Sequence, residues 1–361
     1  MSEFKTEVVR IRIAPHPNAD RLELAKIGDY QSIVGKGVYT SGDLVAYIQE
    51  GSIVPQELLE ELGLVGKLAG SSSDRVKAVR LRGILSQGIC YPAREGWSEG
   101  DDVSEELGIT KYTPPIPTSM SGEVFDAGPS RTVRYDIENI KRHPDVLVEG
   151  ERVRVTEKLH GTFCCIGVVS QELADPEHGR LFVSSKGLGG KGLAFAPGAE
   201  ENATNLYLRA ARTIDALAKL SERAAELSLF VLGEVFGRGV QDLAYGADVT
   251  AEGAFGFRVF DVRVGALGDP KGRWMGDEEL TTFCDELGLE QVPVLYRGPY
   301  SREKVLELTD GAETVSGEGV HMREGVVVRP TEERRDDAIG RVQLKSVSEG
   351  YLTRRGGTEY N

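Results

Sequence analysis

Three prolines within four positions divide this chain. They lie in residues 113–122, which read TPPIPTSMSG. A proline fixes its own φ and lacks an amide donor, so neither a helix nor a central strand can continue through this segment. We therefore predict a domain over residues 1–112, an extended linker over 113–122 and a second domain over 123–361. A chain of 361 residues has the length for two such domains.

The composition is that of folded globular domains, with 40% hydrophobic and 28% charged residues. No apolar run approaches the roughly 18 residues of a membrane span, so no membrane partner is expected. Four cysteines occur without zinc-type spacing, which favours a reducing, cytoplasmic location. The net charge of −14 opposes contact with nucleic-acid phosphates, but an average over the whole surface does not exclude a local basic groove.

The first domain reads as an all-β barrel or sandwich. Short β-type runs separated by glycine-containing turns are typical of such folds. The predicted strands cover residues 7–13, 22–27, 32–34, 44–48 and 75–81, and one short helix is expected over 55–62.

The second domain reads as α+β. Apolar residues at helical spacing predict one amphipathic helix over 203–227. The predicted strands cover residues 153–157, 163–169, 181–184, 228–235, 255–262, 324–329 and 341–345.

Four stretches of the second domain each place a charged residue at or beside the end of a predicted strand. They are TEKLHGT (156–162), LGEVFG (232–237), REGVVVR (323–329) and VQLKS (342–346). Their charged residues Lys158, Glu234, Glu324 and Lys345 are far apart in the sequence. They can therefore act together only if the fold gathers them into one cleft.

Two lysines, two glutamates and a glycine form a chemically sensible set. A lysine has a free pKa of about 10.4 and is a poor nucleophile at neutral pH. A second cation such as Lys345 or a metal is expected to lower the pKa of Lys158, whose free amine could then attack phosphorus or a carbonyl. Glu234 and Glu324 offer hard oxygen ligands for Mg²⁺ or Mn²⁺. Gly161 lets the backbone approach a ligand closely. The set favours nucleotidyl transfer.

In this order the four stretches resemble the motifs of the covalent nucleotidyltransferase superfamily of polynucleotide ligases and RNA capping enzymes. The Lys-x-His-Gly-Thr form resembles more narrowly the Deinococcus-type nick-sealing RNA ligases, and the resemblance covers about residues 131–352. It implies an adenylyltransferase domain that uses ATP with Mg²⁺ or Mn²⁺. It further implies that Lys158 takes AMP, that AMP passes to an RNA 5′-phosphate, and that a 3′-hydroxyl then displaces AMP. The implied partner is RNA in a nicked duplex or RNA–DNA hybrid, handled by a monomer.

The resemblance also implies roles for individual residues. Lys158 is the nucleophile, Glu324 binds the catalytic metal, Glu234 contacts the ribose or a hydrated metal, and Lys345 contacts the α-phosphate.

The remaining residues belong to the nucleotide pocket. Thr156 and Glu157 are expected to line the adenine site, and Phe257 to stack on adenine unless it is ordinary core packing. Lys186 lies near the phosphates or the RNA end, or else in an exposed turn. His160 either contacts the nucleotide or holds the motif loop by hydrogen bonds.

Three positions depart from the common ligase pattern. Most ligases have aspartate at the position of His160, arginine at that of Phe163 and lysine at that of Gln343. Histidine fits the Deinococcus-type group, whereas Gln343 removes one cationic phosphate contact.

The first domain is similar to the tRNA-binding oligonucleotide-binding (OB) modules found beside some aminoacyl-tRNA synthetases. The similarity rests on residues 16–27, 42–47 and 81–88 and covers about residues 8–93. Such barrels bind nucleic acid with a strand face and its loops. An OB-like barrel ahead of a ligase core is also the arrangement of the Deinococcus-type group.

Two alternatives remain open from the sequence. The protein could be an ATP-dependent DNA ligase, or a non-catalytic RNA-binding protein with a degenerate ligase core. The intact Lys158, Glu234, Glu324 and Lys345 disfavour the second alternative.

Overall fold

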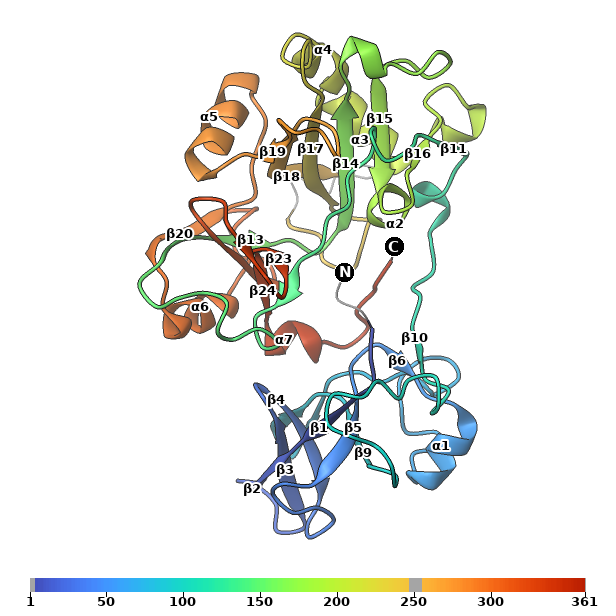
Figure 1. The fold of residues 1–361 in the computed structure, drawn as a ribbon, viewed down its shortest axis with the longest axis vertical. Helices are drawn as coiled ribbons and strands as arrows, with labels where there is room; N and C mark the ends of the chain where they lie inside the picture. Colours follow the sequence, from blue (N-terminus) through green and yellow to red (C-terminus); the bar gives the residue numbers. More distant parts are fainter. Residues whose placement is uncertain (1–3, 247–254, 361) are drawn as a thin grey trace. The chain divides into compact units, whose positions relative to one another are not determined.

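The computed structural model describes residues 4–246 and 255–360. The chain forms two compact units, drawn in Figure 1. Unit 1 contains the residues up to Thr113 together with Asn139–Pro144 and Glu349–Arg355, and unit 2 contains Pro114–Glu138, Asp145–Ser348 and the residues from Gly356. Two short segments from the predicted second domain are thus grouped with unit 1. The proline-rich segment includes a 3₁₀ turn, Thr118–Met120, whose Met120 is buried in the core of unit 2.

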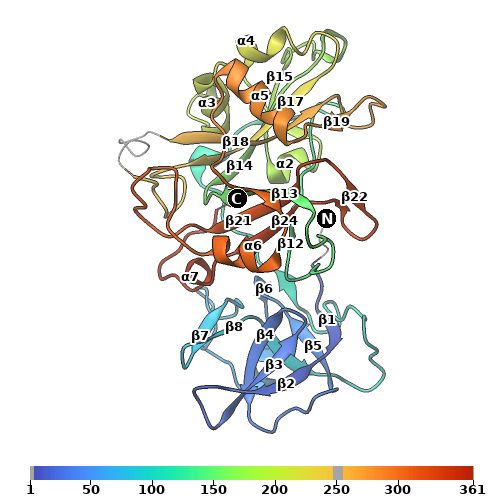
Figure 2. The same ribbon diagram turned by 90° about the vertical axis from the view of Figure 1, so that its left-hand side faces the viewer.

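Unit 1 is built mainly from short antiparallel strands (Figure 2). One sheet joins β1 (Glu7–Arg10), β5 (Leu44–Ile48) and β9 (Ile89–Pro92), and a second joins β2 (Arg12–Pro15), β3 (Leu22–Ile27) and β4 (Tyr30–Gly35). The remaining strands are the pair β6 (Ser52–Ile53) and β10 (Thr110–Lys111) and the hairpin β7 (Val79–Leu81) and β8 (Ile84–Ser86). The helices are α1 (Gln56–Glu61), which follows Pro55, and α7 (Glu349–Leu352).

The predicted strands of unit 1 are mostly confirmed. The run 7–13 is divided into β1 and β2, and the run 75–81 forms a strand only over β7. Arg75 instead bridges to Ile53 and Ala69. The predicted helix 55–62 is α1, whose buried Leu58 and Leu59 pack on the β1–β5–β9 side of the core.

Unit 2 contains two five-stranded sheets. The first sheet has the order β12 (Glu138–Asn139), β24 (Leu344–Val347), β21 (Gly325–Pro330), β13 (Arg152–Lys158) and β20 (Val294–Pro299). The second has the order β15 (Leu181–Ser185), β14 (Thr162–Val168), β17 (Leu229–Phe236), β18 (Gly256–Val264) and β19 (Arg273–Trp274), and Figure 1 shows β14, β17 and β18 side by side. Two short pairs complete it, β11 (Val124–Asp126) with β16 (Leu193–Phe195) and β22 (Arg335–Asp336) with β23 (Gly340–Arg341).

The second sheet of unit 2 is covered on one face by helices α3 (Leu206–Thr213), α4 (Ala216–Ser221) and α5 (Asp277–Leu287). The predicted single helix over 203–227 is wrong, because Asp215 adopts a left-handed φ of 52° and separates α3 from α4. Helix α6 (Arg302–Thr309) packs on β21 and β24 of the first sheet (Figure 2), and α2 (Lys186–Gly189) follows β15.

Alternation along β17 separates two apolar faces. Val231 and Val235 join the cluster under the helices, whereas Phe230 and Leu232 face the opposite side. All four cysteines are buried in apolar clusters, as expected for small core residues. Burial raises the pKa of the Cys90, Cys165 and Cys284 thiols to about 12.

A buried charge cluster joins the two sheets of unit 2. Asp261 of β18 is fully buried, and its carboxylate accepts hydrogen bonds from Arg341 and, at 3.0 Å, from Arg329 of β21. The Tyr135 hydroxyl lies 2.9 Å from Asp261 Oδ2 and 2.9 Å from Gln343 Oε1. Burial alone raises the pKa of Asp261, but the two guanidinium groups outweigh it and lower that pKa. The cluster therefore holds an ionised carboxylate between the sheets.

We expect Asp261→Asn to lower the free energy of unfolding of unit 2 by about 3–5 kcal/mol, because it removes the fully buried carboxylate between two guanidinium groups and leaves them only the partly exposed Glu333. Urea-induced unfolding followed by fluorescence would measure this. The chain has two tryptophans, so a Trp97→Phe background leaves Trp274, whose ring lies 4.2 Å from the Arg341 guanidinium, as the reporter of unit 2.

The loss of stability caused by Asp261→Asn should depend on pH. A pKa lowered by folding contributes stability above the ordinary carboxyl pKa of about 3.9 and loses it as pH falls through the folded value. The difference in the free energy of unfolding between wild type and Asp261→Asn should therefore become smaller in acid.

As a control, Glu286→Gln breaks the exposed Arg223–Glu286 pair and should lower the free energy of unfolding by less than about 1 kcal/mol. Equal effects from both variants would contradict the role given to Asp261.

Candidate active site

The site begins where the chain passes from one sheet of unit 2 to the other. Strand β13 ends at Lys158, which pairs with Gly325 of β21 in the first sheet. Residues 159–161 then lead directly into β14 of the second sheet. Because β13 and β21 are antiparallel, Lys158 meets the start of β21, where Glu324 precedes Gly325. The fold thus brings together two motifs that are far apart in the sequence.

Lys158 and Glu324 form a direct ion pair. Lys158 Nζ lies 2.6 Å from Glu324 Oε1, and the two side chains are 24% and 10% exposed. Burial alone lowers the pKa of the Lys158 amine, but the carboxylates of Glu324 and Glu234 outweigh it and raise that pKa. The expectation of a lowered pKa at Lys158 is therefore wrong for the protein by itself.

Glu234 comes from the second sheet. It lies on β17 opposite Phe163 of β14, and its carboxylate accepts a hydrogen bond from the Gly161 amide. Burial raises the pKa of Glu234 to about 8, and the nearby Lys158 opposes this shift only in part. Glu234 is therefore a carboxyl group whose charged form needs a nearby cation.

Two further lysines complete the charge cluster. Lys345 lies on β24 opposite Val327 of β21, and burial together with the charges of Lys158 and Lys186 lowers its pKa to about 8. Lys186 opens α2 with a 57% exposed side chain, and its Nζ lies 3.4 Å from Asp136 Oδ1. The lowered lysine pKa expected at Lys158 is found at Lys345.

Hydrogen bonds hold the loop after the lysine. The His160 amide donates to the Tyr245 hydroxyl, and His160 Nε2 lies 2.8 Å from Asp242 Oδ1. His160 therefore makes the hydrogen bonds that are expected if it holds the motif loop. A Cβ on Gly161 would lie 2.1 Å from the Val235 carbonyl oxygen. Only glycine allows this approach to β17, so Gly161 is needed for packing within the protein.

Thr156 and Glu157 lie on β13 just before the lysine. Thr156 is 9% exposed, and its hydroxyl lies 3.4 Å from the Val327 carbonyl oxygen. Glu157 is 1% exposed, and its Oε2 accepts hydrogen bonds from the Thr314 amide (2.9 Å) and hydroxyl (2.6 Å). Its Oε1 is buried and accepts no hydrogen bond from any residue that the structure describes. Burial raises the pKa of Glu157.

The structure does not place Phe257 on the face of the sheet that carries Glu234. Phe257 is 8% exposed and belongs to the cluster under the helices, with its ring against Gly233. Phe260, three residues later, packs on the opposite face, where Glu234 also projects, and its ring lies 5.9 Å from that of Phe163. Sequence reasoning missed Phe260 because both phenylalanines lie in one strand-like run. Only the strand's packing shows which face each one occupies.

Gln343 belongs to the buried charge cluster. Its Nε2 donates to the Asp136 carbonyl oxygen at 2.7 Å, and its Oε1 lies 2.9 Å from the Tyr135 hydroxyl. The nearby Arg341 is bound to Asp261 and Glu333. Arg341 is thus held by two carboxylates, and the lysine whose charge acts on both Lys345 and Glu234, besides Lys158, is Lys186.

The carboxylates suit a hydrated divalent cation. Glu324 Oε2 is buried without a hydrogen bond from any described residue, and His160 Nδ1 lies 3.9 Å from it. Within residues 4–246 and 255–360, no three His, Cys, Asp or Glu side chains gather as a metal site. Mg²⁺ commonly binds one or two carboxylates and completes its shell with water and substrate phosphates. Glu324 and Glu234 fit that pattern.

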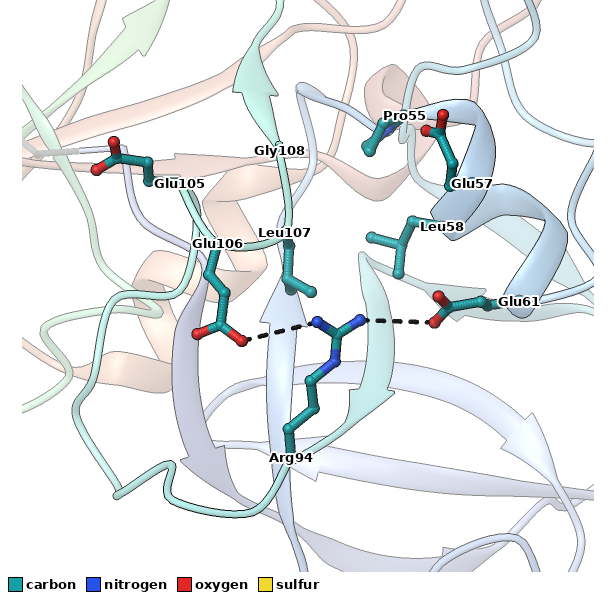
Figure 3. A pocket seen from close by; sticks show the side chains of 9 residues that line it. All are labelled: Pro55, Glu57, Leu58, Glu61, Arg94, Glu105, Glu106, Leu107 and Gly108. Atoms are coloured by element: carbon teal, nitrogen blue, oxygen red, sulfur yellow. Dashed lines mark ion pairs between the residues drawn. The ribbon is translucent and has the colours of Figure 1, made fainter.

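Unit 1 has a cavity of about 320 Å³ with an acidic lining (Figure 3). The Arg94 guanidinium lies between Glu61 and Glu106, 3.7 Å from each carboxylate. The lining also includes Pro55, Glu57, Leu58, Glu105, Leu107 and Gly108. Four glutamates against one arginine disfavour phosphate contact here, so this part of unit 1 is unsuited to a nucleic-acid backbone.

The chain belongs to the RNA ligase family, because the family model described as RNA ligase matches residues 151–347. The family match supports an enzyme of the class that joins RNA ends. An OB-fold domain model matches residues 6–93. The predicted fold class, an OB domain followed by a nucleotidyltransferase domain, is confirmed. No described helix has both the length and the apolar character to cross a membrane.

Solved structures of the RNA ligase of Naegleria gruberi have the same fold. A variant with ATP and manganese has a TM-score of 0.74 at 23% identity, over 96% of this chain and 97% of that one. The structure with pyrophosphate has a TM-score of 0.75 at 23% identity, over 97% and 98% of the two chains. A variant with AMP and manganese has a TM-score of 0.73 at 22% identity, over 96% and 97%. No curated protein matches the chain.

Proposed function

We propose that the protein is an ATP-dependent RNA ligase that seals 3′-hydroxyl and 5′-phosphate ends at nicks in a duplex. The observation that carries the proposal is the gathering of Lys158, Glu234, Glu324, Lys345 and Lys186 around one partly exposed amine. ATP and manganese in the Naegleria structures support the choice of nucleotide and metal. His160 in the lysine motif supports a place in the Deinococcus-type nick-sealing group.

Lys158 is the proposed nucleophile. Its deprotonated Nζ attacks the α-phosphorus of ATP, a P–N bond forms, and the bond to pyrophosphate breaks. Glu324 Oε1, at 2.6 Å, orients the amine. Lys345 and Lys186 offset the charge on the phosphate oxygens. The lowered pKa of Lys345 should rise when those anions bind, so its full charge is available where the reaction needs it.

A divalent cation held by Glu324 and Glu234 would neutralise the carboxylates that raise the pKa of Lys158 and would offset charge on the phosphates. Metal binding would therefore explain how Lys158 can lose its proton although Glu324 and Glu234 lie beside it.

The second step breaks the P–N bond that the first step formed, and the third step joins the RNA ends. An RNA 5′-phosphate oxygen attacks the phosphorus of the adenylate, the P–N bond breaks, and Lys158 regains a proton. The RNA 3′-hydroxyl then attacks the activated 5′-phosphate, and AMP leaves. Unit 1 is proposed to bind RNA in these two steps, which its OB fold supports.

The adenine site is proposed to involve Glu157 and Phe260. The buried, unsatisfied Oε1 of Glu157 is a suitable acceptor for an exocyclic amine. Phe260 has a partly exposed ring on the face of the sheet that carries Glu234, so we give it the stacking role first expected for Phe257.

Incubation with α-labelled ATP and Mg²⁺ or Mn²⁺ should leave label on the wild-type protein. Lys158→Ala should abolish the label, because it removes the nitrogen of the P–N bond. Gel electrophoresis under denaturing conditions, with mass spectrometry of the labelled peptide, measures this. Lys271→Ala, at an exposed lysine of unit 2, is the matched control and should label normally. Label that persists in Lys158→Ala would refute the assignment of the nucleophile.

Phe260→Ala should raise the ATP concentration for half-maximal labelling about 5- to 150-fold, because base–aromatic stacking contributes about 1–3 kcal/mol. The maximal labelling rate should change less. The control is Phe257→Leu, which keeps an apolar side chain in the core and should leave the ATP dependence unchanged. The reverse pattern would restore stacking to Phe257.

Duplexes with one nick test the proposed substrate. With RNA as the 3′-hydroxyl strand, sealing should be at least about tenfold faster than with DNA, because a 2′-hydroxyl is the group by which a site distinguishes the two. The nicked duplex should also be sealed faster than the same strands without a complement. Equal rates on RNA and DNA nicks would favour the DNA ligase alternative.

A further inference from the structure

Residues 356–360, hereafter the 356–360 segment, contact the lysine motif through two intervening side chains. The segment belongs to unit 2, although the preceding residues 349–355 are grouped with unit 1. The intervening residues are Gln241 and Asp242, which follow β17 and bond both to the segment and to residues 160–161. The proposed function gives no role to this arrangement.

On the side of the lysine motif, Gln241 and Asp242 hold consecutive residues. Gln241 Nε2 donates to the Gly161 carbonyl oxygen at 3.0 Å, and Asp242 Oδ1 lies 2.8 Å from His160 Nε2. The Gly161 amide in turn donates to the carboxylate of Glu234. One hydrogen bond each therefore separates Gln241 and Asp242 from the loop that joins Lys158 to β14.

On the other side, Thr358 holds both intervening residues. Its amide donates to Asp242 Oδ1 at 2.8 Å, and its hydroxyl accepts from the Asp242 amide at 2.9 Å. The same hydroxyl lies 2.9 Å from Gln241 Oε1, which also accepts from the Tyr360 amide at 3.2 Å. The Tyr360 ring packs against the main apolar cluster of unit 2.

These bonds fix the direction of the Gln241 side chain. An amide side chain has one oxygen and one NH₂ group, and rotation by 180° exchanges them. With Oε1 accepting from Thr358 and Tyr360, Nε2 faces the carbonyl oxygens of Gly161, at 3.0 Å, and of Tyr360, at 3.3 Å. Without the Thr358 hydroxyl, this orientation loses one of its partners. Removal of the Thr358 hydroxyl also removes the acceptor of the Asp242 amide hydrogen bond. Asp242 would then be held less firmly, and so would the His160 ring that it contacts.

We propose that Thr358 is a positioning residue for the nucleophile loop and that it acts through Gln241 and Asp242 to set the rate of adenylyl transfer to Lys158. This inference rests on the proposed function. Misplacement of a reacting group by about 1 Å, caused by a residue far from the chemistry, can cost up to about 10²-fold in rate. ATP binding depends on other residues and should be affected less.

Thr358→Val and Thr358→Ser separate the hydroxyl from the shape of the side chain. Valine keeps the shape and the backbone amide but removes the hydroxyl, whereas serine keeps the hydroxyl. In single-turnover labelling with saturating α-labelled ATP, Thr358→Val should be about tenfold slower than wild type, and Thr358→Ser should be within about twofold of it. The ATP concentration for half-maximal rate should stay within about twofold for both.

Two further variants guard against a general effect on folding. Thr353→Val removes another hydroxyl of the same region, one that donates to the Glu349 carbonyl oxygen at 2.8 Å, and it should label at the wild-type rate. Gln241→Met keeps the length of the side chain but removes the bond to Gly161, and it should reproduce the slow labelling of Thr358→Val. Thermal unfolding of each variant shows whether the fold is kept.

The outcomes distinguish this inference from the proposed function. Wild-type protein that labels, with Thr358→Val at the same rate, would overturn the positioning role. A higher ATP requirement without a slower maximal rate would also overturn it, as would an equal loss in Thr353→Val. If Thr358→Val does not fold, a wild-type labelling rate in folded Gln241→Met overturns the inference. Absence of label on the wild-type protein would remove the proposed function and this inference with it.

Discussion

The close approach of Gly161 to β17 is the contact on which the site depends. Three residues carry the chain from the first sheet of unit 2 to the second, and Val235 near the end of β17 lies so close that no Cβ fits at Gly161. This short crossing places Lys158 at the end of one sheet and Glu234 on the other. The antiparallel pairing of β13 with β21 adds Glu324, and β24 adds Lys345. A longer or bulkier connection would separate the amine from its acidic partners.

The charges of the site are arranged for a ligand that carries both phosphates and a cation. In the protein alone, Glu234 has its pKa raised and Lys345 has its pKa lowered, each to about 8 and each because burial disfavours its charged form. Bound phosphates favour charged Lys345, and a bound divalent cation favours charged Glu234. Both groups therefore become fully ionised when their counter-charges arrive. The full charges of Glu234 and Lys345 are therefore formed only when the phosphates and the cation are bound.

The sequence allowed prediction of the elements with local signals. The runs 22–27 and 44–48 are short and largely apolar, lie between glycine-containing turns and form β3 and β5. The four charged motifs could be recognised from their order. The break in the predicted helix at Asp215 could not be seen, because nothing in its neighbours requires a left-handed residue there. The face occupied by Phe257 and the raised pKa of Lys158 depend on tertiary neighbours. Gln241 and Asp242 lie outside any recognisable motif, so their contacts with Thr358 appear only in three dimensions.

The burial of every cysteine has a chemical consequence for a protein whose proposed nucleophile is an amine. Peroxides and electrophiles react with exposed thiolates, and here all four sulfur atoms are enclosed and held in the protonated form. The proposed nucleophile, an amine, has no sulfur to oxidise. Peroxides are therefore expected to react slowly with the thiols of this protein, unlike with the activated cysteine on which some enzymes depend.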